Sequence, residues 1–108
     1  MTFKEYQEKA WQVAVYPRKG NNIYYPALGL GETGETQNKV KKIMRDHNDQ
    51  ITDDMRTAIG KELGDVLWYV AAMCTELKIS MDDVAQTNMD KLHSRAKRNK
   101  IKGDGDDR

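Results

Sequence analysis

The sequence predicts an all-α fold in which four helices form a single domain. Apolar residues recur at intervals of three and four through most of the chain, which is the spacing of one face of a helix. No stretch of useful length alternates between apolar and polar residues as a half-buried strand does. The 108 residues, of which 38% are hydrophobic, leave room for one modest core.

The first half of the chain is expected to form two helices. The first covers about residues 3–15, where aromatic residues and alanines share one face. A loop rich in Pro, Gly and Asn follows at about residues 17–22. A second helix starts near Pro26, because the missing N–H of a proline costs nothing in a first turn, and it runs to about Asp46.

The second half predicts two longer helices and a tail. Thr52 is expected to cap the third helix, which runs to about residue 77, and Ser80 opens a sequence that resembles a capping box for the fourth. We expect the domain to cover residues 1–98 and the charged residues 99–108 to form a disordered tail. The apolar stripe of the third helix is expected to consist of Ile59, Leu63, Val66, Val70 and Leu77.

Composition excludes several classes of protein. A net charge of +1 gives no general attraction to a nucleic-acid polymer. The longest apolar run, residues 66–74, is far shorter than the ~20 residues that cross a membrane, and residues 1–5 do not open a signal peptide. Cys74 lies in this run, so we expect a buried, reduced thiol and a cytoplasmic protein.

Two acidic pairs, Glu32 with Glu35 and Glu62 with Asp65, are the most informative feature of the chain. A spacing of three residues places both members of a pair on one helical face, with Cβ atoms roughly 5–6 Å apart. Each pair has a glycine directly before its second acid, where alanine would favour a helix by about 1 kcal/mol. We therefore expect something to approach these two backbones closely.

Helix geometry places the two pairs at one height. The second helix continues for roughly 17 Å beyond Glu35, and the third needs roughly 14 Å to climb from Asp53 to Glu62. Antiparallel packing of the two helices would bring the four carboxylates together, where they would repel one another unless cations neutralise them. Oxygen ligands alone favour Mg²⁺, with Mn²⁺ as a substitute, over zinc.

Basic and aromatic residues near these acids allow two interpretations. Lys39, Lys91 and Arg95 either solubilise the surface or bind a polyphosphate beside the metal. Tyr69, one turn after Asp65, either packs in the core or contacts a ligand.

Three segments together resemble the MazG family of nucleotide pyrophosphohydrolases. They read YPALGLGETGE with NKVKK over residues 25–42, KELGDVLWY over 61–69 and NMDKLHSR over 88–95. The resemblance extends over about residues 3–98, and it combines an E-x-x-E motif with a later E-x-x-D motif at a family-like separation. This combination is much more specific than either motif alone. The chain departs from the family at Thr33, where small apolar residues are common, and in having one domain where longer relatives have two.

The resemblance implies the bundle fold of the all-α NTP pyrophosphatases, completed by assembly into a homodimer or homotetramer. It implies Mg²⁺-dependent cleavage of a nucleoside triphosphate between the α- and β-phosphates, which gives a monophosphate and pyrophosphate. Glu35 could act as a base that orients the attacking water rather than as a metal ligand. The implied metal ligands are Glu32, Glu35, Glu62 and Asp65. The implied substrate contacts are Asn88, Lys91 and Arg95. Lys39 and Tyr69 are two further candidates for substrate contact because of their positions near the acids.

Two other functions remain open at this point. An enzyme of the same fold could hydrolyse another pyrophosphate, such as dUTP or phosphoribosyl-ATP. A non-catalytic helical module could use the same bundle for oligomerisation, although a purely structural bundle has no need of four converging carboxylates.

Overall fold

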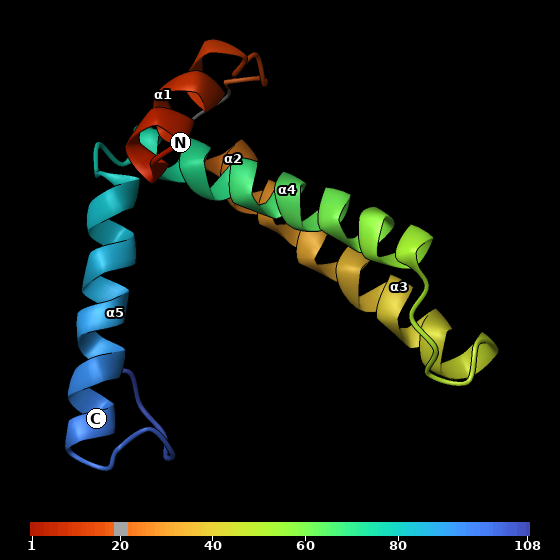
Figure 1. Cartoon of the computed structure of the whole chain (residues 1–108). Helices are drawn as coiled ribbons and strands as arrows, with labels where there is room; N and C mark the ends of the chain where they lie inside the picture. Colours follow the sequence, from red (N-terminus) through yellow and green to blue (C-terminus); the bar gives the residue numbers. More distant parts are fainter. Residues whose placement is uncertain (19–21) are drawn as a thin grey trace.

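The structure is a computed structural model that describes residues 1–18 and 22–108, and it consists of helices joined by short connections (Figure 1). Within these residues there is no strand, so the predicted all-α class is confirmed. Part of the loop expected at 17–22, residues 19–21, lies outside the described residues. The elements are α1 (Phe3–Gln12), α2 (Tyr24–Gly29), the 3₁₀ turn η1 (Leu30–Glu32), α3 (Thr33–Asp46), α4 (Asp53–Glu76) and α5 (Met81–Lys97).

Side-chain caps begin three of the helices. The hydroxyl of Thr52 accepts a hydrogen bond from the backbone N–H of Met55 at 3.2 Å, as expected for the start of α4. Ser80 does the same for α5, accepting from the N–H of Asp83 at 3.4 Å. Thr2 caps α1, which ends three residues earlier than predicted. These local signals place the helix starts where the sequence predicts them.

The predicted second helix is divided into three consecutive pieces. The 3₁₀ turn η1 separates α2 from α3, and its Leu30 carbonyl accepts a hydrogen bond from the hydroxyl of Thr33 at 3.1 Å. A 3₁₀ turn has three residues per turn in place of 3.6, so the turn changes the rotation of the chain immediately before α3. This change affects which way the acidic residues at the start of α3 face.

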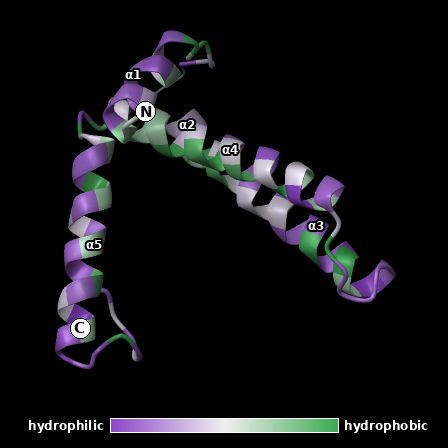
Figure 2. Cartoon of the chain, viewed as in Figure 1, coloured by the Kyte–Doolittle hydropathy of each residue, from purple (hydrophilic) through white to green (hydrophobic). Residues whose placement is uncertain are grey.

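Helix α4 is the centre of the fold, because α1, α2 and α3 all pack against it. The buried cluster consists of Ala10, Ala71, Cys74 and Met81, with Trp68 among the partly buried residues around it. Burial raises the pKa of the Cys74 thiol, in agreement with the buried thiol that the sequence predicts. Figure 2 shows that the apolar colour is concentrated on α4, whereas α5 is mostly hydrophilic.

The core lies toward the C-terminal end of α4, and this corrects part of the predicted apolar stripe. Leu63 is 55% exposed and Leu77 is 48% exposed, although both were expected inside. Around Leu63, α4 packs against the η1–α3 segment, which covers only one side of it. The middle of α4 therefore presents an uncovered apolar side chain to the outside.

Helix α5 leaves the end of α4 at a wide angle and does not lie alongside α3 and α4 (Figure 1). The turn contains Lys78 in a left-handed conformation, with φ of 57°. Gln7 of α1 holds this turn with both ends of its amide: its N–H donates to the carbonyl of Ile79 at 3.0 Å, and its oxygen accepts from the N–H of Met81 at 2.9 Å. A single chain therefore does not close into a compact bundle.

No helix in the described parts of the chain is long and apolar enough to cross a membrane. After α5 ends at Lys97, close to the predicted domain boundary, residues 99–108 bend back toward the same helix.

A glycine that the sequence analysis did not single out allows α2 to pack on α4. A Cβ atom built on Gly29 would lie only 2.2 Å from a ring carbon of Tyr69. The ring itself is fixed edge-to-face against Trp68, with centroids 5.2 Å apart. The close approach of the two helices at this point therefore requires glycine.

Replacement of Gly29 by alanine is expected to destabilise the fold by about 1–3 kcal/mol, because the new methyl group overlaps a packed ring. Gly31→Ala is the matched control, since nothing lies within 4 Å of a Cβ at that position. Urea unfolding followed by circular dichroism measures both. Equal stabilities of the two variants would contradict this account of the contact.

Candidate metal and phosphate site

Three of the four predicted metal ligands meet at one place between α3 and α4. Glu32 ends the 3₁₀ turn, and Glu62 and Asp65 follow each other by one turn on α4. One carboxylate oxygen from each lies within 4.8 Å of the others. Glu32 and Glu62 are partly buried and Asp65 is exposed, so the group stands at the edge of the packed region. The predicted antiparallel packing of the two helices produces this convergence.

The fourth acid, Glu35, is not part of this group. It lies exposed in the first turn of α3, one turn beyond Glu32. The 3₁₀ turn before α3 alters the rotation that a continuous α-helix would give, so uniform helix geometry does not predict the direction of this side chain. Its role as a ligand or as a base remains a prediction.

Lys39 contacts the acidic group directly. Its Nζ lies 3.6 Å from Oε1 of Glu62, and the side chain of Glu62 is only 20% exposed. A cation at this position offsets part of the repulsion among the three carboxylates. The structure thus places Lys39 beside the acids, as the sequence predicts.

Two tyrosines border the same group. Burial raises the pKa of Tyr69, and the nearby negative charges of Glu32 and Asp65 add to the increase, together with Tyr25. The pKa of Tyr6 is raised by burial and by Asp65. Tyr69 is a candidate predicted from the sequence, whereas the helical pattern of residues 3–15 predicts for Tyr6 only a place on one face of the helix. No sequence signal gives the register of α1 against α4, and this register brings Tyr6 close to the acids.

Aromatic rings continue from Tyr69 toward the N-terminal segment. Trp68 meets Tyr16 edge-to-face at 6.2 Å, and Tyr16 stacks on Tyr25 at 5.5 Å with an interplanar angle of 3°. The hydroxyl of Tyr16 donates to the carboxylate of Glu76, and burial with this bond raises the pKa of Tyr16 to about 12. Trp68 therefore packs within the chain.

The glycines of the two acidic pairs are open to the outside. A Cβ atom built on Gly34 or Gly64 would meet nothing within 4 Å. The expectation that a neighbour approaches these backbones is therefore not met by any described part of the same chain. The two acidic stretches are left accessible to a ligand or to a second copy.

The donor set suits a small, hard divalent cation. Carboxylate oxygens bind Mg²⁺ at about 2.1 Å, so the ligand atoms of one ion must lie close together. The oxygens of Glu32, Glu62 and Asp65, all within 4.8 Å of one another, are near enough that rotation of these side chains could bring them onto one such ion. All three ligand atoms are carboxylate oxygens, the type that Mg²⁺ and Mn²⁺ prefer.

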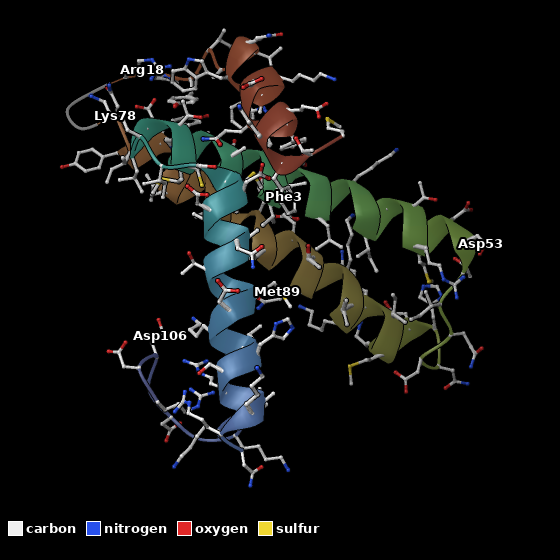
Figure 3. The ribbon with its side chains drawn as sticks, turned by 60° about the vertical axis from the view of Figure 1, so that its left-hand side comes forward. Phe3, Arg18, Asp53, Lys78, Met89 and Asp106 are labelled. Atoms are coloured by element: carbon white, nitrogen blue, oxygen red, sulfur yellow. The ribbon has the colours of Figure 1, made fainter. Side chains whose placement is uncertain are left out.

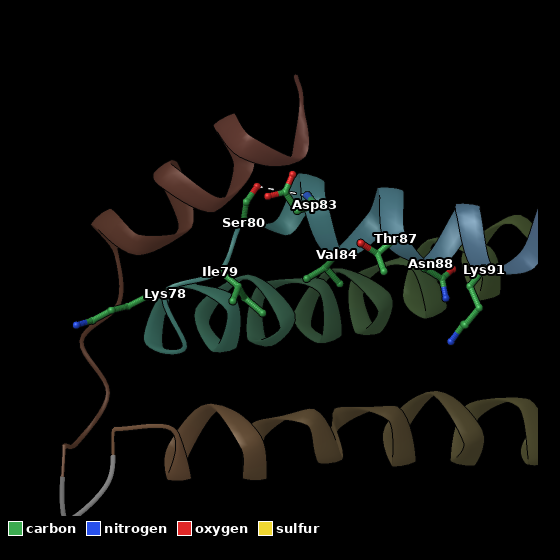
Figure 4. Close-up of a pocket in the computed structure, with 8 residues that line it drawn as sticks. All are labelled: Lys78, Ile79, Ser80, Asp83, Val84, Thr87, Asn88 and Lys91. Atoms are coloured by element: carbon green, nitrogen blue, oxygen red, sulfur yellow. Dashed lines mark hydrogen bonds between the residues drawn. The ribbon is translucent and has the colours of Figure 1, made fainter. Parts of the chain in front are cut away.

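The predicted substrate contacts on α5 lie apart from the acids within one chain. Asn88 and Lys91 line a cavity of about 610 Å³ on one face of α5, together with the turn residues Lys78–Ser80 (Figure 4). Arg95 is only 5% exposed, and its guanidinium donates to Asp106 of the tail. Since α5 diverges from the α3–α4 pair, a single chain does not bring these residues and the acidic group together.

Comparisons with known proteins identify the family of the chain. The MazG nucleotide pyrophosphohydrolase domain matches residues 24–99, a segment that contains every predicted site residue. The "Gene 37 protein" of Mycobacterium phage L5 is 44% identical to the chain over 109 residues, which cover 95% of this chain and 96% of the phage protein. No solved structure shows significant similarity. The chain belongs to the MazG nucleotide pyrophosphohydrolase family.

Proposed function

We propose that the protein is a Mg²⁺-dependent pyrophosphohydrolase that cleaves a nucleoside or deoxynucleoside triphosphate between its α- and β-phosphates. The observation that supports this most directly is the meeting of Glu32, Glu62 and Asp65 from two separate segments within the region that matches the family. Three carboxylates gathered at the edge of a small core repel one another, and the ion pair of Glu62 with Lys39 offsets only part of this repulsion, so a bound divalent cation would stabilise the group.

In this proposal Glu32, Glu62 and Asp65 hold the metal, with Glu35 either as a further ligand or as the base that orients the attacking water. A bound divalent cation would neutralise phosphate oxygens and lower the pKa of a bound water. Lys39, beside the acids, would stabilise the charge that develops on the leaving pyrophosphate. The proposed substrate contacts are Lys39, Tyr69, Asn88, Lys91 and Arg95.

We further propose that a second copy of the chain completes the site, as a homodimer or within a homotetramer. The chain exposes 8200 Å², whereas a compact monomer of 12.4 kDa is expected to expose about 6,100 Å². Its radius of gyration is 16.9 Å, compared with about 13 Å for a globular domain of this length. The excess area of roughly 2,000 Å² is larger than the ~800 Å² that one partner buries in a typical interface. Assembly would let Lys91 and Arg95 of one copy approach the acids of another.

Incubation with a panel of (d)NTPs is expected to give monophosphate and pyrophosphate only when Mg²⁺ is present. Chromatography of the products identifies the bond that is cleaved and the preferred base. Asp65→Asn is expected to reduce turnover at least a hundredfold with the fold intact, because it removes a ligand charge. Asp54→Asn, at an exposed position that pairs with no charged group in the described parts of the chain, serves as the control.

Near-native turnover by Asp65→Asn would contradict the proposed site. Hydrolysis of dUTP or phosphoribosyl-ATP in place of the other nucleotides would favour a different pyrophosphate substrate, and no turnover of any nucleotide by the folded protein would favour a non-catalytic module.

Addition of Mg²⁺ is expected to raise the melting temperature by several degrees, since saturation at 100 times Kd stabilises the native state by about 2.7 kcal/mol. Glu62→Gln should lose most of this increase, whereas Glu8→Gln, on exposed α1, should retain it. Differential scanning fluorimetry with and without EDTA measures the effect. An equal Mg²⁺-dependent shift in both variants would place metal binding elsewhere.

The purified protein is expected to sediment as a dimer or tetramer in analytical ultracentrifugation. Gly60, Leu63 and Gly64 share one exposed face of α4, where no side chain of the described chain covers the two glycines. Leu63→Gln should therefore weaken assembly, whereas Val15→Gln, at a position that is 90% exposed in a loop, should not. A monomer at micromolar concentration would refute the proposed assembly.

A further inference from the structure

Lys91 and Arg95 are the two cations of α5 that the proposed function assigns to the substrate. Both contact the C-terminal segment of the same chain. Oδ1 of Asp106 lies 3.0 Å from Nζ of Lys91 and 3.5 Å from Nη2 of Arg95. The same Nη2 also donates to the backbone carbonyl of Asp106. The segment 99–108 thus places a carboxylate on the two cations that the proposed function assigns to polyphosphate oxygens. Figure 3 shows this segment folded back beside α5, with Asp106 labelled.

The reversal of the chain that makes this contact is built into the sequence. Asn99 has φ of 56°, and Gly103 and Gly105 have φ of 122° and 90°, conformations that glycine adopts without strain. Arg108 then ties the segment together by donating to three backbone carbonyls: those of Lys100 at 3.1 Å, Ile101 at 2.9 Å and Gly105 at 2.7 Å. Arg98, which directly precedes the segment, donates to the carbonyl of Arg108 at 2.8 Å.

Arg95 retains binding capacity in this arrangement. The residue is 5% exposed, and its buried Nε has no hydrogen-bond partner in the described structure. A buried guanidinium with an unused donor is costly, and a ligand with several oxygens, such as a polyphosphate, satisfies it better than one carboxylate does.

The contact is also weak enough to be replaced. The side chain of Asp106 is 85% exposed and that of Lys91 is 36% exposed, and an ion pair exposed in this way contributes little because water screens it. Lys91 and Arg95 hold the pKa of Asp106 below its usual range, so the carboxylate stays ionised and continues to compete with anions near neutral pH.

We propose that residues 99–108 form an autoinhibitory strap whose Asp106 occupies Lys91 and Arg95 until a polyphosphate displaces it. This inference rests on the proposed function, in which these two cations bind substrate phosphates. A triphosphate carries more negative charge than a monophosphate, so it displaces the strap more readily. The strap therefore displaces a bound monophosphate product more readily than it displaces a bound triphosphate substrate.

Two variants of the full chain test the strap by isothermal titration calorimetry with inorganic tripolyphosphate in EDTA. Arg108→Ala removes the three carbonyl contacts and also removes a positive charge. Simple electrostatics then predicts weaker anion binding, whereas release of the strap predicts binding that is tighter by roughly two- to fivefold. Asp106→Asn is expected to tighten binding by a similar factor. Asp107→Asn removes the same charge from an exposed residue that has no partner among the described residues, so it should have a much smaller effect.

Weaker binding by Arg108→Ala, or equal affinities of Asp106→Asn and Asp107→Asn, would overturn the strap. Absence of tripolyphosphate binding by every variant, with normal circular dichroism, would also overturn it. The same preparations are assayed for NTP turnover. Tighter tripolyphosphate binding without any turnover would refute the proposed reaction and leave the strap intact. Normal turnover with unchanged affinities would refute only the strap.

Discussion

The antiparallel packing of α3 against α4 is the constraint on which the site depends. It brings Glu32 to the same level as Glu62 and Asp65, although thirty residues of chain separate the two segments. The negative charges repel one another at this spacing, and this repulsion opposes the packing that brings the carboxylates together. Lys39 offsets only part of it. Helix α3 is held on α4 by its own contacts, which include the buried Ile43, and the other end of α4 is fixed where Ala71 and Cys74 are buried and Tyr69 lies on Gly29. A packed end and a charged middle divide α4 into a part that stabilises the fold and a part available for chemistry.

This division leaves one chain with a packed core and with uncovered faces on its helices. The buried cluster joins α1, α4 and the start of α5, so the helices are fixed relative to one another. The middle of α4, around Leu63, and one face of α5 remain uncovered. A 12.4-kDa chain cannot cover all of its helices with a core of this size. In the proposed assembly, the faces that a single chain leaves open carry the residues that one copy lends to another.

Features encoded by neighbouring residues could be predicted from the sequence, and those set by distant contacts could not. Thr52 and Ser80 cap helices through hydrogen bonds to residues three positions away, so their positions were predictable. The convergence of Glu32 with Glu62 and Asp65 followed from helix lengths and antiparallel packing, whereas the separation of Glu35 from this group did not. The direction of α5 depends on Lys78 and on Gln7, which is more than seventy residues from the turn it holds. The exposure of Leu63 and the contact at Gly29 likewise depend on tertiary packing that helical periodicity does not contain.

The amide of Gln7 has a mechanical consequence for the whole molecule. Helix α5 has 17 residues and is about 25 Å long, and it is anchored chiefly at its first turn. A rotation of only 10° at this anchor would displace the far end of the helix by about 4 Å. The two hydrogen bonds that Gln7 makes on either side of Ser80 therefore act as the fixed point of a lever arm. A small shift of the Gln7 amide is therefore amplified into an ångström-scale shift of Arg95. The positions of the distant cations thus depend on the N-terminal helix.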